Sequence, residues 1–200
     1  MINFNENLLT AMDLETTGLD PLHHDIVQIC LLPLCPYTLE PHPKYRPFYQ
    51  NVRPRRPENA DPQAMAINGL DMEDLMVCPT AEQVEDAIVE WRATIDLPVG
   101  KRLIPLAQNS SFDVSFMQQF LGGDLYGQIF SRRGRDTMYF SAALADRASY
   151  LGFALPFSDF GLKGLCKHFG INIDGHHDAM ADCIATAQVY RELLRMELME

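Results

Sequence analysis

The stretch from Leu8 to Leu19 constrains the fold of this chain more than any other. Its apolar first half is typical of a buried strand, yet two acids, Asp13 and Glu15, follow directly. Because side chains alternate between the two faces of a strand, residues two apart leave the same face. Burying two unpaired carboxylates side by side would cost many kcal/mol, so we expect a divalent metal ion against that face. Thr17 and Gly18 then provide the turn that ends the strand.

Length and composition indicate a single domain over residues 1–200, with 47% apolar and 22% charged residues. No apolar run reaches the roughly 18 residues that a membrane span requires, and residues 1–6 lack the pattern of a secretory signal. We therefore expect a cytoplasmic protein without a membrane partner. The net charge of −11 excludes a protein that coats nucleic acid by charge alone. It is compatible with a protein that binds the end of a nucleic-acid strand through metal ions, since two divalent cations would change the net charge from −11 to −7.

The five cysteines are odd in number and show no CxxC spacing. Such a set is typical of reduced thiols in a cytosolic protein and does not indicate a zinc site. The cysteines are Cys30, Cys35, Cys78, Cys166 and Cys183.

Hydrophobic periodicity predicts an α/β fold, with a mixed central β-sheet of about five strands flanked by helices. Three strands open the chain, and the later strands are separated by helices. After the opening strand, strands are expected at 25–35, 44–52 and 102–107, and Pro47 places the second of these at a sheet edge. Helices are expected at 61–67, 80–95, 110–119, 138–147, 159–169 and 178–196.

Capping residues support several of these helix starts. Asp61 precedes a proline at the first helical position, and Thr80 with Gln83 matches a capping box. Asn109 or Ser110 can cap the helix that runs through residue 119.

Two clusters of arginines interrupt an otherwise acidic chain. Each cluster can be a solvated loop or a basic rim that steers a phosphate backbone, and the sequence leaves both interpretations open. The clusters are Arg53, Arg55 and Arg56, and Arg132, Arg133 and Arg135.

Two further motifs carry acids that could join the first pair. Asp113 would lie in the first turn of its helix, where the helix dipole favours an acid in any case. His177 and Asp182 are five residues apart, which is about 500° of rotation on a continuous helix. They can converge only if His177 lies in the loop before the last helix and Asp182 in its first turn or two.

The three motifs together resemble a known family. A DxE on a strand, an NxxFD opening a helix and an HxxxxD at the last helix occur here in that order. This combination resembles the 3′–5′ exonucleases with four acids and a catalytic histidine (the DEDDh group), which have a ribonuclease H-like fold. The resemblance covers about residues 8 to 195 and implies that fold. The proline-rich segment 33–62 has no counterpart in the group members that we compared.

The resemblance also implies roles for the acids and the histidine. Asp13, Glu15 and Asp182 would hold a first metal ion, and Asp13 would also touch a second. Asp113 would contact the metal site directly or through water. His177 would be the general base, because it has the five-residue spacing to Asp182.

A second set of residues is implied to hold the end of the substrate. In the group, the backbone after the DxE contacts the terminal nucleotide, and an apolar residue packs on its base. The segment 67–70 resembles the part of these enzymes that covers the last base. The implied substrate-binding residues are Thr16, Thr17, Gly18, Leu19, Asn109 and Phe112.

The chemistry of phosphodiester cleavage agrees with these assignments. Two ions about 3.5–4 Å apart stabilise the attacking and leaving oxygens, and oxygen ligands favour Mg²⁺ or Mn²⁺. A histidine with an ordinary pKa of about 6.5 can take a proton from water near neutral pH. The expected partner is the 3′ end of a single-stranded nucleic acid. A polymerase or a second copy of the chain, forming a homodimer, stays open as a protein partner.

Three functions follow as hypotheses. The first is a metal-dependent 3′–5′ exonuclease that releases nucleoside 5′-monophosphates from single-stranded DNA. The second is an RNA-specific 3′–5′ exoribonuclease, since nothing in the sequence decides whether a 2′-hydroxyl is recognised. The third is a binding module that keeps the fold without catalysis, which has no evident need for four acids and a histidine.

Overall fold

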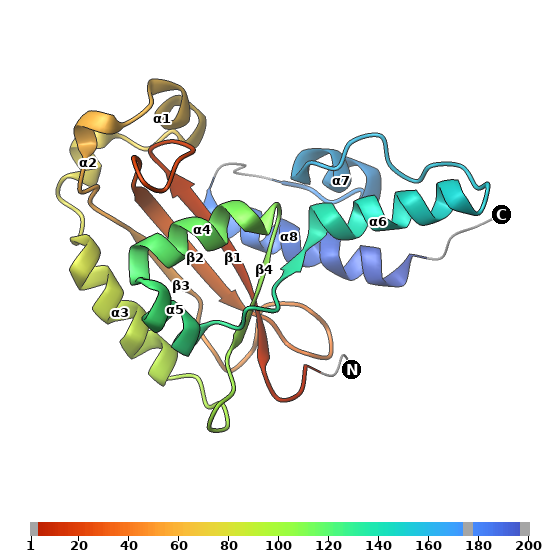
Figure 1. The fold of residues 1–200 in the computed structure, drawn as a ribbon, viewed down its shortest axis with the longest axis horizontal. Helices are drawn as coiled ribbons and strands as arrows, with labels where there is room; N and C mark the ends of the chain where they lie inside the picture. The colour runs from red at the N-terminus through yellow and green to blue at the C-terminus, as the bar shows by residue number, and fades with distance from the viewer. Residues whose placement is uncertain (1–3, 174–177, 197–200) are drawn as a thin grey trace.

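The computed structural model describes residues 4–173 and 178–196, and a five-stranded mixed sheet lies at its centre (Figure 1). The strand order is β3-β2-β1-β4-β5. β2 pairs antiparallel with β1 and β3, whereas β4 runs parallel to β1 and β5. The predicted α/β fold with about five strands is confirmed. The strands are β1 (Leu8–Thr16), β2 (Ile26–Pro33), β3 (Phe48–Asn51), β4 (Leu103–Ala107) and β5 (Arg135–Asp136).

Helices flank the sheet, and three of them, η1, α2 and α5, were not predicted. α2 has only four residues, and α5 begins at Gly123, inside the glycine pair that predicted only a break. In the described parts of the chain, the helices are the 3-10 helix η1 (Pro57–Asn59), α1 (Pro62–Asn68), α2 (Met72–Leu75), α3 (Ala81–Ala93), α4 (Ser110–Leu121), α5 (Gly123–Ile129), α6 (Thr137–Tyr150), α7 (Leu162–Phe169) and α8 (Ala179–Arg195).

The predicted caps of α1 and α3 are confirmed. The Asp61 side chain accepts a hydrogen bond from the Gln63 N–H. Thr80 and Gln83 form a reciprocal capping box, in which each side chain accepts from the backbone N–H of the other residue. These contacts satisfy N–H groups that have no partner inside the first turn of a helix.

Two predicted elements are shorter than expected. The strand at 44–52 contracts to the four residues of β3. α7 begins at Leu162 and not at residue 159, because Asp159 Oδ1 accepts a hydrogen bond from the Gly161 N–H (2.9 Å) and forms a turn before the helix.

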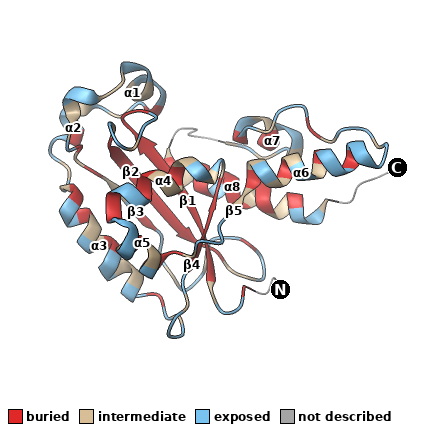
Figure 2. Cartoon of the chain, viewed as in Figure 1, coloured by how far each residue is buried: buried red, intermediate tan, exposed pale blue. Residues whose placement is uncertain are grey.

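Side chains of β1 alternate between two apolar cores. Even-numbered residues such as Met12 and Leu14 pack with α3, α4 and α5, whereas Leu9 and Ala11 pack with α8. A third core joins α6 and α7 to the other side of α8, and β1, β2 and β4 are buried between these layers (Figure 2). Positions 13 and 15 continue the odd-numbered series, so β1 directs their side chains toward α8.

Two predictions from composition can be compared with the fold. All five cysteines are free thiols, as predicted, and Cys30, Cys166 and Cys183 are buried. Among the helices of the described residues, none has both the length and the apolar character needed to cross a membrane.

Candidate active site

β1 and α8 bring three of the predicted acids together. Asp13 and Glu15 lie on β1, and Asp182 lies in the first turn of α8. One carboxylate oxygen of each acid lies within 4.8 Å of those of the other two. Glu15 is 9% exposed and Asp182 is 6% exposed, while Asp13 is partly buried. Three oxygen donors this close together could hold a metal ion.

Burial and mutual repulsion raise the pKa values of these acids. Burial is the largest cause that raises the pKa of Asp13, followed by the charges of Asp113, Asp182 and Glu15. Burial also raises the pKa of Glu15 to about 8, and the charges of Asp182 and Asp178 add to this effect. Without a cation, the acids cannot all be ionised near neutral pH. Because every donor is a carboxylate oxygen, the group fits a hard divalent cation.

The fourth predicted acid, Asp113, lies beside this group. It is in the first turn of α4 and is 3% exposed. Burial raises the pKa of Asp113, while hydrogen bonds from the backbone N–H groups of Asp113 and Leu14 oppose the rise. Among the neighbouring charges, that of Asp113 raises the pKa of Asp13 the most. This indicates that the two carboxylates lie close together. Asp113 is not one of the three acids whose oxygens lie within 4.8 Å.

The start of α4 differs from the prediction. Asn109 has the left-handed backbone conformation (φ 60°), and its side chain makes no capping hydrogen bond to α4. Asp136 from β5 replaces it, because its Oδ2 accepts a hydrogen bond from the Ser110 N–H (2.6 Å). The expected cap by Asn109 or Ser110 is therefore wrong. The Asn109 side chain is left exposed, while Phe112 is half-buried against Phe116 with ring centroids 4.9 Å apart.

Strands β2 and β3 fix the start of α8. Asp178 caps the helix by accepting from the N–H groups of its second and third residues. The Tyr49 hydroxyl of β3 donates a hydrogen bond to the Asp178 carboxylate. Gln28 of β2 is 3% exposed, and its Oε1 accepts from the Ala179 N–H (2.9 Å) while its Nε2 donates to Asn51 Oδ1 (2.8 Å). These contacts fix the position of the first turn of α8, and therefore the position of Asp182 relative to Asp13 and Glu15.

Sequence reasoning missed Gln28, Tyr49 and Asn51. A signal for Gln28 was present, because it is a polar residue inside the apolar run of β2 (IVQICLLP). A buried polar side chain in a strand must find a hydrogen-bonding partner. The partner itself lies 151 residues away, so the sequence alone could not name it.

The turn after β1 is held from behind by the segment 61–68. The Thr17 carbonyl accepts from the Asp61 N–H (2.7 Å), and the Thr16 carbonyl accepts from Asn68 Nδ2 (3.2 Å). Gly18 lets the His24 ring pack closely against this turn, because a Cβ there would lie 2.3 Å from that ring. The turn is thus rigidly supported.

The side chains of this turn divide into two kinds. The Thr16 hydroxyl donates to the Gly18 carbonyl (2.7 Å), and the Thr17 hydroxyl accepts from the Asp25 N–H (2.9 Å), so both hold the turn together. Leu19 is 80% exposed and is free to contact a ligand. Ile67, in the segment expected to cover the last base, is also exposed.

The first arginine cluster is bound within the fold. Each guanidinium donates to a protein oxygen, and Arg56 also donates to the Leu22 and His24 carbonyls. These contacts favour a structural role over a free rim for phosphates. They join Arg53 to the Cys78 carbonyl, Arg55 to Glu82 and Glu85, and Arg56 to Asp25. In the second cluster, Arg132 and Arg133 are exposed, and Arg135 donates to the carbonyls of Arg133 and Gly134.

The predicted general base, His177, lies outside the described residues. The other member of its motif, Asp182, is in the first turn of α8, as the five-residue spacing required.

Comparisons with known proteins agree with this geometry. The exonuclease family model, of the ribonuclease T type, matches residues 10–190. The PolC-type DNA polymerase III of Thermotoga petrophila is 22% identical over 194 residues, which are 97% of this chain and 12% of that protein. The chain thus spans about one eighth of this curated relative.

Solved structures show the same fold. An exonuclease I of E. coli in complex with single-stranded DNA superposes with a TM-score of 0.72 at 18% identity, over 93% of this chain and 40% of that one. A 3′-exonuclease that recognises a histone mRNA stem-loop superposes with a TM-score of 0.69 at 16% identity, over 97% of this chain and 66% of that one. The family match, the fold and the four acids together lead to one assignment. The chain belongs to the exonuclease family whose model it matches.

Proposed function

We propose that this protein is a divalent-metal-dependent 3′–5′ exonuclease that removes nucleoside 5′-monophosphates from the 3′ end of single-stranded DNA. The observation that carries this proposal is the group of Asp13, Glu15 and Asp182, with oxygens within 4.8 Å of one another. We further propose that residues 1–200 act as a single exonuclease domain.

The acids fit two ions of Mg²⁺ or Mn²⁺. Asp13, Glu15 and Asp182 would hold the first, Asp13 would also touch the second, and Asp113 would contact the metal site directly or through water. When bound, such ions lower the pKa of a bound water and stabilise charge on the phosphate and leaving oxygens. The raised pKa of Glu15 supports a cation here, because a positive charge would restore the ionised form.

The residues of the chain have three further tasks in this proposal. His177 accepts a proton from the attacking water, an assignment that comes from its sequence spacing to Asp182. The backbone of the turn at residues 16–18 holds the terminal nucleotide, with Leu19 against its base. Asn109 and Phe112 line the same pocket; the Asn109 side chain is exposed and that of Phe112 is half-buried.

The substrate assignment draws on the relatives. Exonuclease I was solved with single-stranded DNA, and the PolC-type relative is a DNA polymerase. These favour DNA as the substrate and make a polymerase a candidate partner, with a homodimer as the other. The histone mRNA exonuclease of similar fold keeps an RNA-specific exoribonuclease as the second candidate.

The test uses a 5′-labelled single-stranded DNA and its RNA equivalent, each incubated in Mg²⁺, in Mn²⁺ and in chelator. We expect a metal-dependent ladder that shortens from the 3′ end, faster on DNA. Asp13→Ala should abolish it, whereas Asp86→Ala, an exposed acid of α3, should not. His177→Ala should lower turnover by roughly 10²–10⁴-fold, the usual effect of a general base.

Each alternative outcome has a defined meaning. Faster cleavage of RNA would replace the DNA assignment with the exoribonuclease. Retained activity in Asp13→Ala would contradict the metal assignment, and near wild-type turnover in His177→Ala would remove it as the base. Tight binding of both strands without cleavage would favour the non-catalytic module.

A further inference from the structure

α7 lies beside α8, the helix that carries Asp182. Its Cys166 is buried, and the charge of Asp182 adds to burial in raising the pKa of this thiol to about 11, so the two side chains are near each other. The segment before α7 is tied to the start of α4, because Gln108 Nε2 donates to the Phe160 carbonyl (2.8 Å). α7 also packs along α8 in the third apolar core (Figure 1).

The outward side of α7 carries free positive charge. Lys163 and Lys167 are four residues apart, so they lie on one side of the helix, about 6 Å apart along its axis. Both are exposed, whereas Leu162, Leu165 and Cys166 are buried on the other side. No described residue forms an ion pair or hydrogen bond with either lysine side chain. The helix contains no acid.

This contrasts with the other two lysines of the chain. Lys44 pairs with Asp96 (3.5 Å), and Lys101 pairs with Glu6 (3.2 Å). The chain has a net charge of −11, so partners for a surface lysine are abundant. Two of its four lysines nevertheless remain unpaired on one two-turn helix next to the acidic site.

The other elements that border the carboxylates offer no comparable charge. β1, α1 and α4 contain no lysine or arginine. In α8, Arg191 and Arg195 lie in the last two turns and both pair with Glu192. Unpaired cations near the acidic site therefore lie on α7 and, beside Ser110 and Ser111 at the start of α4, at the exposed Arg132.

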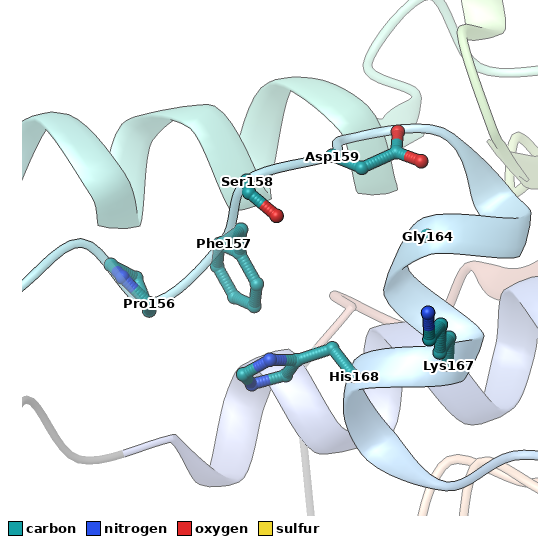
Figure 3. Close-up of a pocket in the computed structure, with 7 residues that line it drawn as sticks. All are labelled: Pro156, Phe157, Ser158, Asp159, Gly164, Lys167 and His168. Carbon is teal, nitrogen blue, oxygen red and sulfur yellow. The ribbon is translucent and has the colours of Figure 1, made fainter.

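A hollow next to Lys167 provides room for such a chain (Figure 3). It has a volume of about 430 Å³ and lies between the segment 156–159 and α7, with Ser158 and His168 in its lining. Gly164 lets this segment approach, because a Cβ there would lie 2.3 Å from the Asp159 side chain. The volume is within the roughly 300–1,000 Å³ of small-molecule sites, so it can accommodate a nucleoside unit beside the lysine.

We propose that Lys163 and Lys167 of α7 bind the phosphate backbone of the substrate strand, on the 5′ side of the bond that is cleaved. This rests on the proposed exonuclease function. A phosphate is a natural partner for a lysine ammonium group, which acts as a compact point charge. The lysines lie beyond the first phosphate, so they contribute to holding a long strand and not to the chemical step.

The test compares substrates of two lengths in one double variant. Lys163→Gln/Lys167→Gln should raise KM for a single-stranded 20-mer by about 5- to 25-fold. Each lysine would contribute up to about fivefold, the effect of one exposed ion pair. The slope of log KM against log salt should fall by about 1.4, or 0.7 per lost contact. Cleavage of thymidine 5′-monophosphate p-nitrophenyl ester should not change, because this substrate has no upstream phosphate.

Lys44→Gln/Lys101→Gln is the matched control. It removes the same charge from lysines that are already paired, and Lys101 precedes β4, at the end of the sheet opposite the acids. Equal KM values for the 20-mer in the two double variants would overturn the proposal. An equal rise in KM for the p-nitrophenyl ester would also overturn the proposal, because the α7 variant would then impair the active site itself.

A binding measurement separates this proposal from the proposed function. Fluorescence anisotropy of the labelled 20-mer in Ca²⁺ reports strand binding without requiring turnover. Weaker binding in the α7 variant alone would support the surface even if the wild type cleaves neither substrate. Equal binding by both variants would overturn it.

Discussion

Removing one charge from the acidic group should stabilise the metal-free protein while it disables the enzyme. The change is Glu15→Gln, which keeps the size of the side chain and removes its charge. Glu15 is 9% exposed and lies near Asp182 and Asp178, whose charges add to the effect of burial. The folded state therefore holds a proton on Glu15 more tightly than the unfolded state does.

The size of the effect follows from the pKa. Folding raises the pKa of Glu15 from 4.5 to about 8. Between these values the folded state binds more protons than the unfolded state, so the free energy of unfolding falls as pH rises through that window. At pH 7 the cost is about 3 kcal/mol, at 1.36 kcal/mol per pH unit above 4.5. For a chain of this length, this corresponds to roughly 6–12 °C in Tm.

The assay is urea or thermal unfolding in chelator at pH 4.5, 6, 7 and 8. Glu15→Gln should be more stable than the wild type at pH 7, and the difference should vanish near pH 4.5. Glu58→Gln, an exposed acid of η1, is the control and should show no such trend. Added Mg²⁺ should stabilise the wild type more than the variant. A wild type whose stability does not fall between pH 5 and 8 would refute the reasoning.

Two further predictions concern the start of α8. Gln28→Leu leaves the buried Ala179 N–H without a partner. It should lower the free energy of unfolding in urea by about 1–3 kcal/mol. A decrease no larger than that caused by Gln63→Leu, an exposed site on α1, would contradict this prediction. Tyr49→Phe removes the hydrogen bond to Asp178 and should raise the half-saturating Mn²⁺ concentration by up to about fivefold, with kcat at saturating metal retained. An unchanged Mn²⁺ requirement would show that this contact does not position the acids.

The part of the site that the sequence predicted depends on short-range rules. Asp13 and Glu15 share a face because a strand has a period of two, and β1 confirms it. Asp182 had to lie early in the last helix, and it lies in the first turn of α8. Each inference needed only the few residues on either side. The motif order then supplied what local rules could not, namely that these distant pieces meet.

The part that the sequence did not predict depends on long-range pairing. The sequence left open whether Arg55 and Arg56 form a solvated loop or a basic rim, because the partners of a charge cluster are not visible in the sequence. Their partners Glu82 and Asp25 lie 27 and 31 residues away and become neighbours only when β2, η1 and α3 assemble. The cap of α4 fails for the same reason, since Asp136 reaches it from β5.

The charge balance of the site supports the proposed binding of metal ions. The positive end of α8 points at the acids, but a helix dipole is equivalent to only about half an elementary charge. The four acids Asp13, Glu15, Asp113 and Asp182 can carry four negative charges when ionised. The lysines of α7 are exposed on its outward side and do not pair with these acids. In the proposed function, two divalent ions would supply four charges to balance the group. The apolar cores on both sides of β1 keep the acids together against their mutual repulsion.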